Sequence, residues 1–144
     1  MSIFFHEEQG VFHLQSDHSS YVTQLVRGLY PAHVYWGPKL RDSQVEGLLT
    51  RRERASFSPS PFRDDASFSF DSLPQEYPGY GSGDFRQPAY QVQLPNGTTV
   101  AEVEYESHRI YGGKPKLEGL PAVYTEQDDE ADTLELRLVD RVSG

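Results

Sequence analysis

The 144-residue sequence carries 22 Asp and Glu against 13 Lys and Arg, which gives a formal net charge of −9 at pH 7. An acidic surface repels phosphate backbones and anionic lipid headgroups, so we expect neither nucleic acid nor a membrane as a partner. The chain has no cysteine, no basic N-terminal segment and no apolar run long enough for a signal core or a membrane span, so we expect a cytoplasmic protein without disulfides or thiolate metal sites.

The first part of the chain predicts a meander of three strands. Residues 11–15, 21–26 and 32–36 are rich in β-branched and aromatic residues, and a polar turn and a Gly/Pro turn separate them. Trp36 is the only tryptophan and lies in the third of these apolar segments. We therefore expect its side chain to be buried.

Residues 38–73, which we call the long loop, show little alternation and are rich in Arg, Ser, Pro and Asp. Such a span without regular structure is uncommon in a compact domain unless it is functional or disordered. Within it, Arg51, Arg52 and Arg54 surround Glu53, and a carboxylate among guanidinium groups can hydrogen-bond a hydroxyl-rich ligand. The alternative is a solvated charged loop.

Residues 73–90, which we call the Gly/Pro segment, contain prolines at 74, 78 and 88 and glycines at 79, 81 and 83, interleaved with aromatic residues. The prolines fix φ and the glycines permit backbone angles closed to other residues, so we expect an ordered, tight path without helix or central strand. A flexible linker is the alternative. Asp84 and Arg86 flank Phe85, and we expect them to form a structural ion pair.

Strand patterns return in the last third of the chain. Residues 90–94 and 99–105 alternate on either side of Asn96-Gly97, which predicts a hairpin with a type I′ turn and with the intervening glutamates on a wet face. Residues 107–111 and 133–139 predict two more strands. Because no segment has a helical period, we expect an all-β antiparallel β-sandwich with little helix.

The last predicted strand is followed by few residues and by no partner strand. A strand that ends a sheet without a partner leaves an exposed edge. We therefore expect residues 1–144 to form a single β-sandwich domain that is incomplete at its C-terminal end.

The sequence offers no complete catalytic set. The histidines at 6, 13, 18, 33 and 108 lack metal-ligand spacing, and we expect His33 and His108 to be half-buried and hydrogen-bonded within strands. The carboxylates at 128–130 form a charge run typical of a solvated turn, whereas glycosidic chemistry requires two carboxyls fixed across a sugar pocket. There is no nucleophile elbow and no phosphate loop. We expect no catalytic residue, no metal and no cofactor.

Several motifs occur in order along nearly the whole chain. They are Ala32-His33-Val34-Tyr35-Trp36-Gly37, Gln75-Glu76-Tyr77-Pro78, Gly83-Asp84-Phe85-Arg86-Gln87-Pro88 and Gly119-Leu120-Pro121-Ala122. In these motifs the sequence resembles the amino-terminal β-domain of the α-galactosidases of glycoside hydrolase family 36. The resemblance implies a parent enzyme made of a β-supersandwich, a (β/α)₈ catalytic barrel and a small C-terminal β-domain.

The resemblance also implies a function. The parent would release terminal α-galactose from melibiose and raffinose-type oligosaccharides with retention, using two aspartates in the barrel. This chain would then be non-catalytic and would support the barrel and the interface of a homo-oligomer, commonly a tetramer. The long loop would reach a neighbouring subunit's substrate pocket, with Glu53 at an acidic position where the family's usual residue is Asp, and with Arg63 as the nearest candidate for a substrate-binding arginine. An independent carbohydrate-binding β-sandwich module is the other function that we consider.

Overall fold

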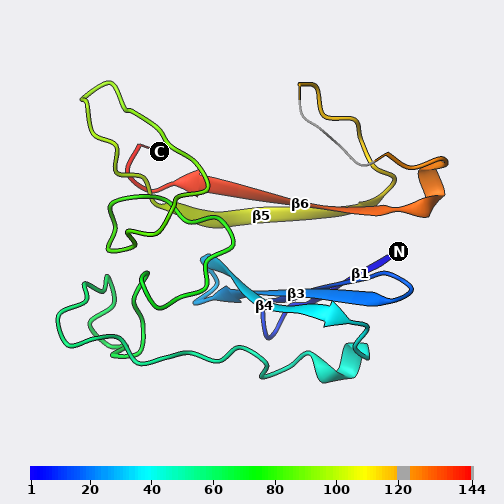
Figure 1. Ribbon diagram of the computed structural model, residues 1–144, viewed down its shortest axis with the longest axis horizontal. Coiled ribbons are helices and arrows are strands. Elements are labelled where there is room, and N and C mark those ends of the chain that lie inside the picture. The colour runs from blue at the N-terminus through cyan, green and yellow to red at the C-terminus, as the bar shows by residue number, and fades with distance from the viewer. Residues whose placement is uncertain (120–123, 144) are drawn as a thin grey trace.

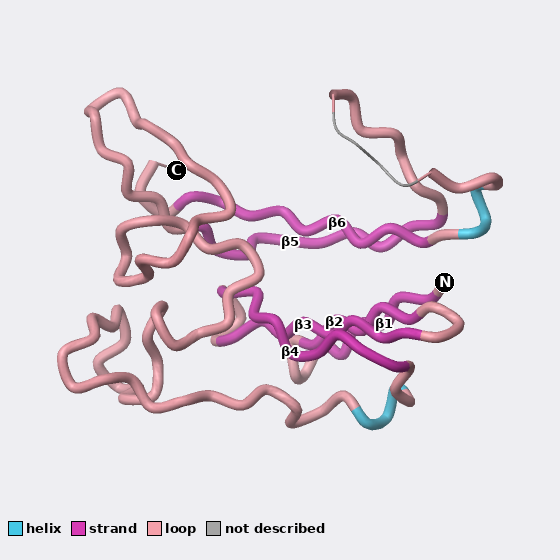
Figure 2. Tube along the Cα trace, in the orientation of Figure 1, coloured by secondary structure: helices cyan, strands magenta, loops and turns pink. Residues whose placement is uncertain are grey.

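A computed structural model describes residues 1–119 and 124–143, and in it two antiparallel sheets lie one above the other (Figure 1). The larger sheet has the order β1-β2-β3-β4 and the smaller one pairs β5 with β6. The strands are β1 (Ser2–His6), β2 (Val11–Gln15), β3 (Ser19–Val26), β4 (Tyr30–Pro38), β5 (Val103–Gly112) and β6 (Asp132–Asp140). Two short 3₁₀ turns, η1 (Asp42–Gln44) and η2 (Asp128–Glu130), are the helical elements of the described residues, and loops make up the rest (Figure 2). The prediction of an antiparallel all-β fold with little helix is confirmed.

The predicted meander is present and has one strand more than the sequence pattern indicated. β1 pairs antiparallel with β2, with Phe4 opposite His13, and the ring of Phe5 stacks on that of Phe12 at 4.4 Å. Leu29 N donates to Val26 O (3.1 Å) across the turn between β3 and β4, where both Arg27 and Gly28 have positive φ angles. A type I′ turn needs such a pair of angles.

The prediction that Trp36 is buried is wrong, because its side chain is 78% exposed. A β-bulge explains the difference: Val22 pairs with Tyr35 and Thr23 with His33, which leaves Val34 as an extra residue in β4. Val34 and Tyr35 therefore both pack on the buried cluster of Val11, Val22 and Val45. The alternation is shifted by one residue, and Trp36 faces solvent.

A second bulge lies where the sequence suggested a break between two strands. β5 is continuous from Val103 to Gly112, and Glu106 is its extra residue, since Tyr105 pairs with Leu138 and Ser107 with Arg137. Residues three apart in a regular strand face opposite sides, but the bulge brings Tyr105 and His108 to the same side. Both rings pack near that of Phe12, with centroids 6.5 and 4.9 Å from it. This contact joins the two sheets.

The predicted hairpin at residues 90–105 is not formed, because the strand that begins at Val103 pairs with β6. The expected wet face is also wrong, since Glu102 and Glu104 each lie 3.0 Å from the hydroxyl of the buried Tyr30. Residues 90–94 form no strand, and Asn96 lacks the positive φ of a type I′ turn. Gly97 alone has a positive φ, its N–H donates to Leu94 O (2.8 Å), and Leu94 N donates to Thr98 O (2.9 Å). These bonds are typical of a type I turn followed by a left-handed glycine, which Pro95 favours because its φ suits the first central position.

The main core lies where the end of the long loop meets the larger sheet. Its buried members are Val26, Tyr30, Ala32, Phe68, Phe70 and Leu73. The start of the Gly/Pro segment runs alongside β4. His33 N donates to Pro74 O (2.7 Å), and Glu76 N donates to Pro31 O (2.9 Å). These bonds cover part of the edge that β4 would otherwise expose.

No helix of the described residues has the length and apolar character needed to cross a bilayer. The Gly119-Leu120-Pro121-Ala122 motif falls largely outside the residues that the structure describes.

Candidate functional site

A buried polar network fixes the beginning of the long loop. His13 is fully buried in β2, and its Nδ1 lies 2.9 Å from Asp42 Oδ1, while its Nε2 lies 2.9 Å from Ser20 Oγ. His6 Nε2 reaches the same Asp42 oxygen at 3.0 Å, and Leu40 N donates to Ser20 Oγ at 2.9 Å. The contacts of His6 and His13 with Asp42 thus fix the position of the loop just after it leaves β4.

The order Ser20, His13, Asp42 is that of a serine-hydrolase triad, but its surroundings do not suit catalysis. Ser20 is 1% exposed and its hydroxyl already accepts a backbone N–H, so a substrate carbonyl has no approach to Oγ. Burial alone would raise the pKa of Asp42, but the hydrogen bonds from His13 and His6 lower it below its usual value. The network is therefore a structural anchor. No local sequence pattern indicates this network, because its hydrogen-bonded partners lie 7 to 36 residues apart.

The far end of the long loop is fixed by aromatic and ionic contacts. Phe62 packs edge-on against Phe68 with ring centroids 4.8 Å apart, and the Arg27 guanidinium lies 3.9 Å from the centre of the Phe62 ring. Arg27 also pairs with Asp64 at 3.2 Å. Together with the Asp42 network, these contacts anchor the loop on both sides of residues 50–60, and that stretch is itself bonded to Asp65 through Arg51 and to Asp71 through Ser58.

Glu53 and Arg63 are both exposed side chains of the long loop. Arg51 pairs with Asp65 at 3.0 Å, and Arg54 Nη1 donates to Ser58 O at 2.6 Å. In the part of the chain that the structure describes, no hydrogen bond or ion pair involves Glu53 or Arg63, and none joins one to the other. The two arginines therefore hold the loop's shape, and the Glu53 carboxylate is available to a ligand.

The Gly/Pro segment is ordered by the expected ion pair. Asp84 is 1% exposed, and its Oδ1 and Oδ2 lie 2.8 and 2.7 Å from Nε and Nη2 of Arg86. Gln75 Nε2 adds a third contact at 3.1 Å, and Arg86 Nη2 also donates to the carbonyls of Phe70 (3.0 Å) and Leu73 (2.7 Å). Burial alone would raise the pKa of Asp84, but the bonds from Arg86 lower it. The pair joins the Gly/Pro segment to the end of the long loop.

A hollow of about 440 Å³ opens between these two segments. Phe57 and Phe85 lie at its wall and are 92% and 74% exposed. Its two carboxylates have protein partners, because Asp71 accepts bonds from Ser58 (2.7 Å) and Ser69, and Asp84 accepts those from Arg86. The wall thus presents two exposed aromatic rings beside two carboxylates that already have hydrogen-bond donors within the protein.

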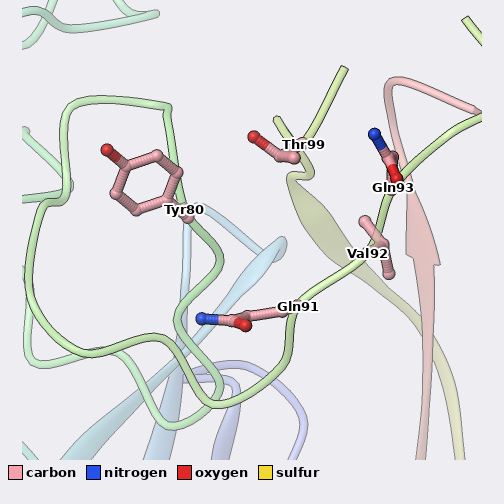
Figure 3. Close-up of a pocket in the computed structure, with 5 residues that line it drawn as sticks. All are labelled: Tyr80, Gln91, Val92, Gln93 and Thr99. Carbon is pink, nitrogen blue, oxygen red and sulfur yellow. The ribbon is translucent and has the colours of Figure 1, made fainter. Parts of the chain in front are cut away.

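A second hollow, of about 550 Å³, lies between the Gly/Pro segment and the residues that follow it. We call it the Gln/Thr pocket, and its walls are Tyr80, Gln91, Val92, Gln93 and Thr99. Figure 3 shows the Gln91 amide extending toward the side on which Tyr80 lies, with Val92 and Gln93 on the other side. None of these side chains carries a formal charge. The pocket has no local signature in the sequence, because its walls come from opposite sides of a turn and from a separate loop.

Two of the three remaining histidines, His33 and His108, form side-chain hydrogen bonds within the fold. Nδ1 of His33 lies 3.1 Å from Glu76 Oε1, and Nδ1 of His108 lies 2.6 Å from the hydroxyl of Tyr105. Both residues are partly buried, as predicted. Across the described ranges, no three His, Asp or Glu side chains gather to hold a metal ion.

Comparison with known proteins supplies a family for this arrangement. The model of the "Glycosyl hydrolase family 36 N-terminal domain" matches residues 29–144. Alpha-galactosidase AgaA of Geobacillus stearothermophilus is 52% identical over all 144 residues, which cover 20% of AgaA. The crystal structure of the family 36 alpha-galactosidase AgaB from the same organism is 51% identical and has a TM-score of 0.86, covering 99% of this chain and 19% of AgaB.

A further similar structure contains a sugar. It is that of an AgaA variant in complex with raffinose, with a TM-score of 0.82 and 54% identity, and the match covers 93% of this chain and 18% of that one. The chain thus spans about a fifth of the length of the relatives that it matches.

Proposed function

Because the chain belongs to the N-terminal domain family of glycosyl hydrolase family 36, we propose that it is the non-catalytic β-domain of an α-galactosidase. The observation that carries this proposal is the 52% identity that extends over the whole chain yet covers only 20% of AgaA. In this proposal residues 1–144 form one domain, and a catalytic barrel elsewhere in the same enzyme, which the domain supports, supplies both aspartates of a retaining mechanism. The enzyme acts in the cytoplasm, consistent with an acidic, cysteine-free sequence.

The chemistry of the two larger hollows supports a non-catalytic role. A retaining glycosidase needs two carboxyl groups about 5 Å apart on either side of the scissile bond. The Gln/Thr pocket has no carboxylate in its wall, and Asp71 and Asp84 in the other hollow are bound by serine hydroxyls and by Arg86. A carboxylate held by an arginine is a poor nucleophile and a poor proton donor.

In this proposal the long loop is the part of the domain that contacts the substrate. Glu53, together with Arg63, contacts the sugar in the pocket of a neighbouring subunit of a homo-oligomer, a tetramer. Glu53 suits this role because it is exposed on a stretch anchored at both ends and because its carboxylate is not engaged within the described residues. Carboxylates and guanidinium groups hydrogen-bond sugar hydroxyls in complementary ways. The substrates are terminal α-galactosides of the melibiose and raffinose type.

A chimeric enzyme tests this function. The matching N-terminal fifth of AgaA is replaced by the present chain, and hydrolysis of p-nitrophenyl α-galactoside is compared with that of the 144-residue chain alone. We expect an active chimera and an inactive chain. Turnover by the purified 144-residue chain above a mock preparation, or a folded chimera without activity, would refute the proposal.

One observation favours a second function, that of an independent carbohydrate-binding module. Trp36 is 78% exposed near the end of β4, and exposed tryptophan rings often stack on the apolar faces of sugars. A titration of the chain with galactose or raffinose, followed by the fluorescence of its single tryptophan, decides this point. A saturable change that is specific to these sugars supports the module, and a flat response rejects it.

A further inference from the structure

We propose that the Gln/Thr pocket binds a neutral saccharide. This proposal goes beyond the function proposed above, because it concerns a surface distinct from the long loop and from Trp36 and can be tested on this chain alone. The volume of about 550 Å³ lies within the range of about 300–1,000 Å³ that is typical of small-molecule sites.

The backbone holds Tyr80 in the pocket wall through close approach of the glycines on either side of it. A Cβ built at Gly79 would lie 2.4 Å from Ala101 O, and one at Gly81 would lie 2.7 Å from Val100 Cγ2. Only glycine allows such contacts, and Gly81 also has a φ of +103°. Ala101 N donates to Tyr80 O at 3.4 Å. Close packing of Gly79 and Gly81 on residues 100–101 thereby fixes the backbone of Tyr80, whose side chain lines the pocket with residues 91–93 and 99.

The turn at Leu94–Gly97 sets the opposite walls. The bonds from Gly97 N to Leu94 O (2.8 Å) and from Leu94 N to Thr98 O (2.9 Å) bring Thr99 back beside Gln93. Thr98 N also donates to Asn96 Oδ1 at 3.0 Å, which closes the turn. The pocket is therefore built by two separately fixed pieces of backbone.

The lining chemistry indicates the ligand class. Each glutamine amide and each hydroxyl of the pocket both donates and accepts hydrogen bonds, as sugar hydroxyls do, and the Tyr80 ring offers an apolar face for sugar C–H groups. Within the residues that the structure describes, the side chains of Gln91, Gln93 and Thr99 form no hydrogen bond with the protein. Because no charged residue lines the pocket and the chain has a net charge of −9, a neutral ligand is favoured over an anionic one.

The test is a titration of the ¹⁵N-labelled 144-residue chain with raffinose, with galactose, and with galacturonate as the anionic control. We expect saturable shifts of the side-chain amide resonances of Gln91 and Gln93 with the neutral sugars and weaker binding of galacturonate. The variant Gln91→Ala/Gln93→Ala should weaken raffinose binding roughly ten-fold or more, because it removes hydrogen bonds made in the pocket. Tyr80→Ala should weaken it as well.

Matched controls are Gln44→Ala in η1 and Tyr124→Ala, both of exposed residues outside this pocket, which should leave binding unchanged. Absence of saturable shifts at Gln91 and Gln93, or unchanged affinity in a folded Gln91→Ala/Gln93→Ala variant, would overturn the proposal. Shifts confined to Trp36 and its neighbours would also overturn it and would support the second function above instead. If Glu53 proved to have no part in substrate binding in an enzyme, the expected binding of sugar in the Gln/Thr pocket would not change. The two proposals can therefore fail separately.

Discussion

Asp84 lies buried with its two carboxylate oxygens 2.8 and 2.7 Å from Nε and Nη2 of Arg86, two residues further along the chain. The same guanidinium reaches two carbonyls at the end of the long loop. A single local pair therefore sets the position of the Gly/Pro segment relative to the loop, and the walls of both hollows depend on that segment.

Arg86→Ala should lower the free energy of unfolding by roughly 1–3 kcal/mol, because it leaves the Asp84 carboxylate buried without its charged donor. Urea unfolding followed by circular dichroism measures the loss. Arg109→Ala is the matched control, since Arg109 forms a similar two-bond contact with Glu135 on an exposed face and should matter little. An equal loss in the two variants would show that burial of the Asp84 pair contributes nothing.

Stability should fall in acid as Asp42 and Asp84 become protonated. The folded-state pKa of each is lowered, so their stabilisation is complete above the unfolded pKa of about 3.9 and is lost as pH falls through the folded-state values. Unfolding free energies measured between pH 6 and pH 2.5 should therefore drop mainly below about pH 4. In Asp84→Asn the drop should be shallower. If the unfolding free energy of Asp84→Asn differed from that of the wild type by the same amount at every pH, protonation of Asp84 would not contribute to the loss of stability in acid.

Gly81→Ala should destabilise the fold more than Gly47→Ala. Both glycines have a positive φ, at +103° and +68°, so an alanine is strained in each by about 1–2 kcal/mol. Only at Gly81 does the added Cβ also meet Val100, whereas nothing lies within 4 Å at Gly47. Thermal unfolding of the two variants isolates the packing contribution. Equal melting temperatures would indicate that the Gly/Pro segment moves away from Val100 without loss of stability and does not fix the position of Tyr80.

The exposure of Trp36 predicts a tryptophan emission maximum typical of a solvated indole and strong quenching by acrylamide. Trp36→Tyr should change the unfolding free energy by less than about 0.5 kcal/mol, as is usual for surface positions. A blue-shifted emission that acrylamide quenches poorly would contradict the shifted alternation in β4.

The sequence pattern predicted those strands in which apolar and polar residues alternate without interruption. β2 and β6 were predicted within a residue or so of their ends, because nothing interrupts their period of two. The bulges at Val34 and Glu106 add a residue to one strand only, and a single-strand pattern cannot reveal this, so Trp36 was placed on the wrong face. The turn at Asn96-Gly97 was assigned from its dipeptide, although Pro95 favours a type I turn.

The candidate site was predictable only in part. The Asp84–Arg86 pair was recognisable because both partners lie in one short segment. The anchor of His13 on Asp42 was not, since β2 and η1 meet only in the folded chain. The Gln/Thr pocket likewise depends on how closely Gly79 and Gly81 approach residues 100–101, which is a property of the packed structure.

Glu53 provides the most direct test of the proposed role of the domain, in the AgaA chimera that carries this chain. Glu53→Ala should lower kcat/KM for raffinose by about 1–3 kcal/mol of transition-state binding, roughly 5- to 150-fold, with folding and oligomer size unchanged. Glu53→Asp should retain activity, and Glu46→Ala, which removes another exposed carboxylate of the same loop, should have no effect. Unchanged kinetics in a folded Glu53→Ala chimera would contradict the account and leave Glu53 as a solvated loop residue.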